Sequence, residues 1–465
     1  MAQTRSRNRQ AELFPRAKRA VPIAIDENHR FVHVTEEIDW TEIEGVVQSV
    51  RMSKVKNGAG RPPQLRALTG AVVFRAVRRM SYRETEDQIR YYLPARYLCG
   101  LTETEWTPDA NTIQDFEQLL GEEGMKQINE YVVKWAVEEK LADPRVLTAD
   151  TTAQEARIPY PNEMGLMAAF MTAVVAASRS VGGKLKGFMQ KSGDWLQQVK
   201  RKVRQYRLFA KDKTKAIKNR MVAEVADLVD RVQQELGEAL VAGSAHKERL
   251  RKYGKVAWAK VTKLHGTMGK LLPQIRHWLK TGHVAPSKII NLRIPELYAI
   301  VRGKVGKPVE FGLTWGIGRL GGGFLLGTRT QDKRELVDSK FAIRAVRDHI
   351  TMFGKAPRGY GYDRGGWSRG NVKELKRLGV QQVGVAPRGR AQWLVDGKVK
   401  ERLVSERAQV EGGIGNIKCD KYGFNRPAAQ SAAMMGMCGQ RSLVGFNLTK
   451  LIRGLAQRKE VVLVG

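Results

Sequence analysis

Three acidic residues are the candidates for chemistry in this chain. Asp150 closes a short apolar run, Asp363 stands in a glycine-rich segment, and Glu411 lies within a helical pattern. The 465 residues include 81 lysines and arginines against 47 aspartates and glutamates, for a formal net charge of +34. In so basic a protein, three carboxylates that meet in space would form a cation site.

A trio of carboxylates supplies only oxygen ligands, which favour Mg²⁺ or Mn²⁺ over zinc. Asp150 and Asp363 are each expected at the end of a strand, and the helix of Glu411 is expected to pack across that end. Two such ions, about 3.5–4 Å apart, activate a water or a 3′-hydroxyl and stabilise the leaving oxygen of a phosphoryl displacement. We therefore predict that Asp150, Asp363 and Glu411 are both metal ligands and catalytic residues, with two ions per active site.

The charge surplus is spread over the whole chain, so the expected partner is a polyanion, because neutralised phosphates release counterions. An anionic membrane is the weaker alternative. The longest uncharged apolar run, Met164–Ser178, is too short to span a bilayer and indicates a buried helix. The first residues lack the apolar segment of a signal peptide. The three cysteines are far apart, as is typical of a reducing cytoplasm.

Composition and turn residues divide the chain into four parts. We predict an N-terminal arm and linker over residues 1–60 and a helical domain for DNA binding or dimerisation over residues 61–141. A capping box at Ser81–Glu84 opens one helix of that domain. A basic helical insertion is predicted over residues 165–285. Six arginines are expected on exposed faces of the helical domain, namely Arg66, Arg75, Arg78, Arg79, Arg83 and Arg90.

The insertion is the most basic part of the chain. Between Lys184 and Arg220 there are thirteen lysines and arginines against only Asp194 and Asp212. This imbalance is too one-sided for pairing within each helix, which favours phosphate contacts over a merely solvated helix pair. The side chains expected to contact DNA there are Lys200, Arg201, Lys202 and Arg204.

Residues 142–164 and 286–465 read as a mixed α/β domain, a central sheet covered by helices on both sides. Strands are predicted at 145–150, 288–292, 309–319, 323–329, 381–386 and in a segment that ends at Asp363. Helices are predicted at about 332–353, 370–378, 408–418 and 428–458.

These motifs together resemble the DDE transposases of bacterial insertion sequences. The resemblance spans roughly residues 60 to 455, and the Arg-x3-Glu-x6-Lys spacing is its most specific part. The motifs that carry it are Asp150-Thr151-Thr152, Ile158-Pro159-Tyr160-Pro161, Asp363-Arg364-Gly365-Gly366 and Arg407-x3-Glu411-x6-Lys418. Further similar segments are Arg302–Gly312, Gly60–Pro63 and Met80–Glu84.

The resemblance implies an RNase H-like mixed sheet flanked by helices. It also implies a magnesium-dependent enzyme that cleaves and joins DNA at terminal inverted repeats. Arg407 would hold phosphates near the transposon end, and Lys418 a terminal phosphate or base. Trp393 would either stack a flipped base or belong to the core. The implied partners are double-stranded transposon ends and target DNA, bound by a homodimer in the bacterial cytoplasm, without a membrane.

The chain departs from the family pattern in two places. Val404 stands where relatives carry a tyrosine, three residues before the arginine. The interval between Asp150 and Asp363 is long, whereas relatives with an insertion carry it in the second interval. Glu406 is a rival for the third acid, and the Arg-x3-Glu-x6-Lys spacing favours Glu411.

Two other functions stay open from the sequence. One is an RNase H-like nuclease or a Holliday-junction resolvase. The other is a DNA-binding protein derived from a transposase that has lost its chemistry.

Overall fold

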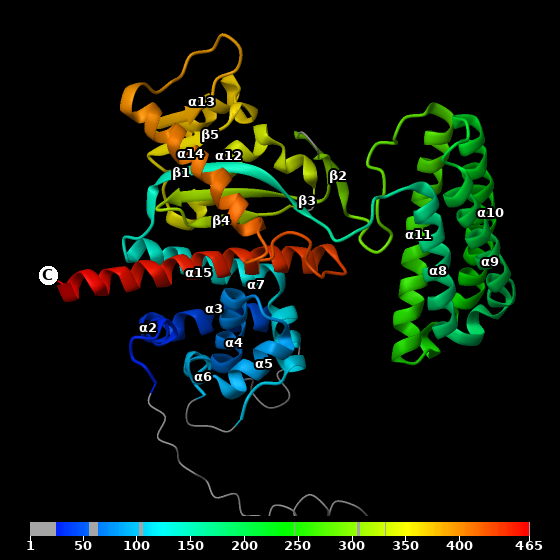
Figure 1. Cartoon of the computed structure of the whole chain (residues 1–465), viewed down its shortest axis with the longest axis horizontal. Coiled ribbons are helices and arrows are strands. Elements are labelled where there is room, and N and C mark those ends of the chain that lie inside the picture. Colours follow the sequence, from blue (N-terminus) through cyan, green and yellow to red (C-terminus); the bar gives the residue numbers. More distant parts are fainter. Residues whose placement is uncertain are drawn as a thin grey trace, which may run out of the picture.

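The computed structural model describes residues 25–54, 64–101, 106–245, 247–304, 307–330 and 332–464. Figure 1 shows three parts: an N-terminal group of helices, a sheet with helices on its faces, and a helical bundle to one side of the sheet. The predicted linker at Gly60–Pro63 lies outside the described residues.

One mixed sheet forms the centre of the molecule. Its strands are β1 (Asp143–Glu155), β2 (Tyr298–Lys304), β3 (Lys307–Gly321), β4 (Leu325–Thr328), β5 (Gly359–Tyr362) and β6 (Gln382–Val385). The order is β2-β3-β1-β5-β6, with β4 also paired to β3. Strand β1 is antiparallel to β3 and parallel to β5, and β5 is parallel to β6. This mixed topology is consistent with the RNase H-like core that the resemblance implies.

Helices cover both faces of this sheet, as predicted. Helices α12 (Asp338–Phe353) and α13 (Arg369–Arg377) pack on one face, and α14 (Gly397–Lys418) packs on the other. The strands are glycine-rich under α14, where Leu403 of that helix lies against the sheet. A Cβ atom added at Gly384 would lie 2.6 Å from a Leu403 methyl carbon, and one at Gly359 would lie 3.2 Å from it. The missing side chains therefore let α14 approach β5 and β6 closely.

Strand β1 is longer than the predicted strand, which ended at Asp150. It continues to Glu155 as an antiparallel partner of β3. Its second half carries buried polar side chains that bond to distant residues. Gln154, fully buried, donates to the Met435 carbonyl oxygen at 2.8 Å and accepts from the Trp315 indole N–H at 3.0 Å. Asp150 is therefore an internal residue of β1. It lies just beyond the part of β1 that pairs with β5, which ends at Thr148.

The N-terminal helices form one core with the last helix of the chain. They are α2 (Arg30–Glu37), α3 (Trp40–Lys54), α4 (Leu65–Arg78), α5 (Tyr82–Tyr91), α6 (Leu93–Leu98) and α7 (Ala110–Glu138). Helix α15 (Ala432–Val464) packs along α7 and α4. Helices α2 and α3, in the segment predicted as arm and linker, contribute buried residues such as Phe31 and Val47. The capping box at Ser81 and Glu84 is confirmed.

The inserted segment is a bundle of four helices. They are α8 (Glu163–Val181), α9 (Lys186–Phe209), α10 (Lys215–Ser244) and α11 (Lys252–Thr281), with short 3₁₀ turns at Gly182–Leu185 and Lys247–Arg249. Residues 156–162, which include Pro159 and Pro161, connect β1 to α8. Helix α8 is long and apolar enough to cross a membrane by length and composition, and 56% of that window is buried. Its apolar side chains belong to the bundle core, which confirms the predicted buried helix.

One predicted strand and the predicted exposure of two arginines differ from the structure. Residues 288–292 are not a strand, because the Asn291 side chain accepts from the N–H groups of Arg293 and Ile294, and Pro295 follows this turn. Arg75 is buried, not exposed, because it forms an ion pair with the buried Glu117. Arg66 is also partly covered, since its guanidinium lies 3.2 Å from the centroid of the Trp40 ring.

Candidate active site at the ends of β1 and β5

The parallel pairing of β1 with β5 brings Asp150 and Asp363 to one place. The last pair of this ladder is Thr148 with Gly361, and each acid lies two residues further along its own strand direction. The register therefore carries Asp150 and Asp363 to neighbouring positions at the same end of the ladder. The sequence prediction that these two acids meet at one sheet end agrees with this arrangement.

Both acids lie on the face that α14 covers. A Cβ atom added at Gly361 would lie 2.9 Å from the Thr148 methyl carbon and 3.3 Å from the Leu403 carbonyl oxygen of α14. Thr148 and position 361 therefore face this helix. Because side chains alternate between faces, positions two residues further on face the same way. Asp150 and Asp363 are both partly buried there.

The protein surroundings favour the neutral form of Asp363. Burial raises its pKa, and the negative charge of Asp338 raises it further. The N–H of Gly365, which donates to the Asp363 carboxylate at 2.8 Å, and the positive charge of Arg407 act in the opposite direction. Asp363 and Asp150 also act on the buried Tyr360. Burial raises the pKa of that phenol, and the charges of Asp363 and Asp150 add to the effect.

Asp338 is a site residue that sequence reasoning missed. It is the first residue of α12 and accepts hydrogen bonds from the Thr151 hydroxyl at 2.8 Å and from the Tyr362 hydroxyl at 3.3 Å. Aspartates are common at the start of helices, where their charge is favourable. Nothing in the local sequence therefore distinguished Asp338 from an ordinary helix-start residue. In the structure it approaches the same strand ends from the α12 side of the sheet.

Helix α14 brings Arg407 close enough for its charge to act on Asp363, and Glu411 lies one turn further along the helix. The Arg407 guanidinium forms an ion pair with the Glu411 carboxylate at 2.9 Å, one turn along the helix. The Glu411 side chain is 61% exposed, and that of Arg407 is 34% exposed. Among the described residues, no group of three or more Asp, Glu, His or Cys side chains lies close enough together to hold a metal ion. Glu411 as the third ligand therefore stays a prediction.

Glu406, the rival third acid, has a partner within the sheet. Its carboxylate forms an ion pair with Arg319 of β3, a side chain that is only 8% exposed. The same guanidinium also donates to Gln409, three residues after Glu406 on α14. These contacts fix α14 on the sheet. Glu406 thus has a partner in the sheet. The partner of Glu411 is Arg407, whose charge also acts on Asp363.

The remaining predicted DNA contacts lie at the end of α14, before α14 and on the bundle. Lys418 is partly buried in the last turn of α14. Trp393 is partly buried before α14, with the Lys400 ammonium 5.5 Å from its ring centroid. Lys200, Arg201 and Arg204 are exposed on α9, whereas Lys202 forms an ion pair with Glu224 of α10 at 2.7 Å.

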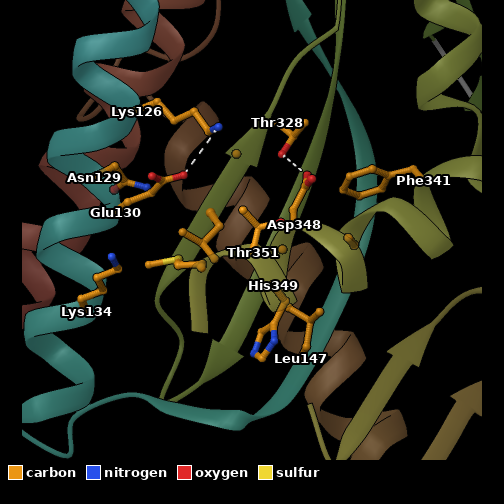
Figure 2. Close-up of a pocket in the computed structure, with 15 residues that line it drawn as sticks. Lys126, Asn129, Glu130, Lys134, Leu147, Thr328, Phe341, Asp348, His349 and Thr351 are labelled. Atoms are coloured by element: carbon orange, nitrogen blue, oxygen red, sulfur yellow. Dashed lines mark hydrogen bonds and ion pairs between the residues drawn. The ribbon is translucent and has the colours of Figure 1, made fainter. Parts of the chain in front are cut away.

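A cavity of about 180 Å³ lies elsewhere, between α7 and α12 (Figure 2). Its lining includes Lys126, Lys134 and Asp348, and Asp348 accepts from the Thr328 hydroxyl at 2.9 Å. Neither Asp150 nor Asp363 lines it. The candidate site at the end of the β1–β5 ladder is therefore separate from this cavity.

Comparison with known proteins gives one finding. Residues 22–119, which include helices α2 to α6 and the start of α7, match the family described as Transposase domain (DUF772). No curated protein and no solved structure matches the chain. The N-terminal helical region is thus similar to a transposase domain, which suggests a transposase.

Proposed function

We propose that the chain is a DDE-type DNA transposase that binds terminal inverted repeats and cleaves and joins DNA strands. The observation that supports this most is the shared position of Asp150 and Asp363 at the end of the β1–β5 ladder, under a helix that carries Arg407 and Glu411. The transposase domain at residues 22–119 supports the same function from an independent part of the chain.

Asp150, Asp363 and Glu411 would hold two Mg²⁺ or Mn²⁺ ions in this proposal. The donors fit such ions, because all are carboxylate oxygens. The raised pKa of Asp363 means that the surrounding protein alone does not stabilise its charged form, which a bound cation would do. Bound ions of this kind activate the attacking hydroxyl and stabilise the leaving oxygen.

The role of Arg407 follows from its two neighbours. It forms an ion pair with Glu411, and its charge also acts on Asp363. For Glu411 to serve as a ligand, its carboxylate must leave this guanidinium. Arg407 would then be available for a phosphate of the DNA end, a ligand that suits its planar group of donors.

Cleavage of a labelled duplex with the element's own terminal inverted repeat tests the proposal. Wild type should nick the repeat boundary in Mg²⁺ and not in EDTA. Asp150→Ala, Asp363→Ala and Glu411→Ala should each lower the rate at least about a hundredfold, while DNA binding persists. Glu401→Ala, an exposed acid on the same helix, is the matched control and should cleave normally. Tight binding without nicking by wild type would instead favour a DNA-binding protein without chemistry.

A further inference from the structure

The acidic residues of the bundle are concentrated in one helix. Helix α10 contains five of them, α9 contains only Asp194, and α11 contains none. Helix α10 packs beside both α9 and α11 and lies diagonally across the bundle from α8. The bundle therefore has two sides of different charge.

Basic side chains on the α10 side are neutralised within the bundle. Lys191 and Lys202 of α9 form ion pairs with Glu235 at 3.0 Å and with Glu224 at 2.7 Å. Arg276 of α11 forms ion pairs with two acids of α10, Asp227 at 3.1 Å and Asp230 at 2.6 Å. These three cations mark the sides of α9 and α11 that face α10.

Other cations of α9 lie on the opposite side of that helix. With about 100° of rotation per residue, Lys200, Arg204 and Arg207 lie roughly 140–200° around the helix from Lys202. All three are exposed. Because α8 and α10 are the two neighbours of α9 in the bundle, cations on the side of α9 away from α10 lie on its α8 side.

Helix α11 repeats this arrangement. Lys260 and Lys263 lie roughly 140–200° around the helix from Arg276, again on the α8 side. Both are exposed. The two helices therefore direct two rows of lysine and arginine to the same side of the bundle.

Helix α8 lies between these two rows. Its exposed residues include Ala169, Thr172 and Ala176, which are small and uncharged. Its one acidic residue, Glu163, forms an ion pair with Lys288 at the start of the helix. In Figure 1, α8 and α11 lie on the side of the bundle nearer the sheet. We call this side of the bundle, with α8 at its centre and the cations of α9 and α11 at its edges, the α8 face.

We infer that the α8 face binds duplex DNA through the phosphate backbone. Neighbouring helices pack about 8–10 Å apart. The axes of α9 and α11, which lie diagonally across the bundle from each other, are therefore separated by roughly 11–14 Å. This separation is close to the about 12 Å width of the DNA major groove, so each row can contact phosphates on one side of it. The inference rests on the proposed function only for the class of partner. It excludes Lys202 from the DNA contacts and adds Lys260 and Lys263.

Binding of the full chain to a fluorescent duplex of arbitrary sequence, in EDTA, tests the inference. The first variant combines Lys200→Ala, Arg204→Ala, Lys260→Ala and Lys263→Ala. The matched control removes four cations on the α10 side, by Lys191→Ala, Lys202→Ala, Arg220→Ala and Arg231→Ala. The first variant should bind at least about tenfold more weakly, and the slope of log affinity against log salt should fall by about 3–4. The control should change affinity less than about twofold.

Equal losses in both variants would show a general charge effect and overturn the inference. Loss of dimerisation with unchanged DNA binding in the first variant would show that the α8 face joins two copies of the chain, and would also overturn it. Circular dichroism of both variants verifies the fold. The outcome is separate from catalysis. Wild type that binds through the α8 face but never nicks a repeat would contradict the proposed function and leave this inference standing.

Discussion

Glu117 and Asp363 are both buried or partly buried acids, and the protein treats them in opposite ways. Glu117 of α7 is fully buried and contacts two arginines, Arg75 of α4 at 2.6 Å and Arg441 of α15 at 3.1 Å. Burial alone would raise the pKa of Glu117, but the two guanidinium groups outweigh it, and the pKa is lowered. Asp363 has a second acid, Asp338, in its surroundings, and its pKa is raised.

This difference separates a structural charge from a charge at the proposed active site. At Glu117 the chain supplies the opposite charge, and the ion pairs join the N-terminal helices to α15. At Asp363 the chain places acids near one another and offsets them only in part. Under the proposed function, a metal ion would supply the rest. An acid with a raised pKa beside other acids is thus a better indication of a site than burial alone.

The largest expected effect comes from removal of the structural acid. Glu117→Ala should lower the free energy of unfolding by about 3–5 kcal/mol, because it leaves two arginines without their buried partner. Urea denaturation followed by circular dichroism measures this loss. The triple variant Arg75→Leu, Glu117→Leu and Arg441→Leu should be less unstable than Glu117→Ala. A loss below about 1 kcal/mol for Glu117→Ala would contradict the structural role assigned to the cluster.

Metal addition should give an intermediate effect, and only at the functional acids. Mn²⁺ at ten times its dissociation constant should stabilise wild type by about 1.4 kcal/mol per bound ion. A thermal melt with and without Mn²⁺ detects this without any DNA or activity. Asp363→Asn should lose most of the shift, whereas Glu401→Gln should keep it. An equal shift in Asp363→Asn would place the bound ion elsewhere on the protein.

The smallest expected effect is a pH dependence of opposite sign at the two acids. Since the folded-state pKa of Asp363 is raised, its contribution to stability is present below the unfolded pKa and is lost as pH rises through the folded pKa. The pKa of Glu117 is lowered, so its contribution is present above the unfolded pKa and is lost as pH falls through the folded pKa.

In EDTA, Asp363→Asn should therefore gain in melting temperature relative to wild type as pH rises from about 4 to about 7. The corresponding gain in the free energy of unfolding should stay below about 1 kcal/mol, since the group is only partly buried. A melting temperature that falls relative to wild type over this range would mean that the protein stabilises the Asp363 carboxylate, as it does that of Glu117.

The sequence predicted local elements better than partners between them. Strand β5, helix α13 and strand β6 lie close to their predicted bounds, because glycine turns and helical periodicity are local signals. The second half of β1 was missed, because its buried Gln154 finds partners only in β3 and α15. Asp338 was missed and Arg75 was wrongly predicted as exposed for the same reason. Their roles depend on Thr151 and Glu117, which are distant in sequence.

The connection from β1 to the bundle limits how far bound DNA can move from the acids. Residues 156–162 span at most about 23–25 Å even when fully extended, and two prolines stiffen them. A duplex bound to the bundle therefore stays close to β1, the strand that carries Asp150. Short connections of this kind give effective concentrations in the millimolar range. Weak phosphate contacts on the bundle would then suffice to keep a DNA end near the site while its two strands are cleaved in turn.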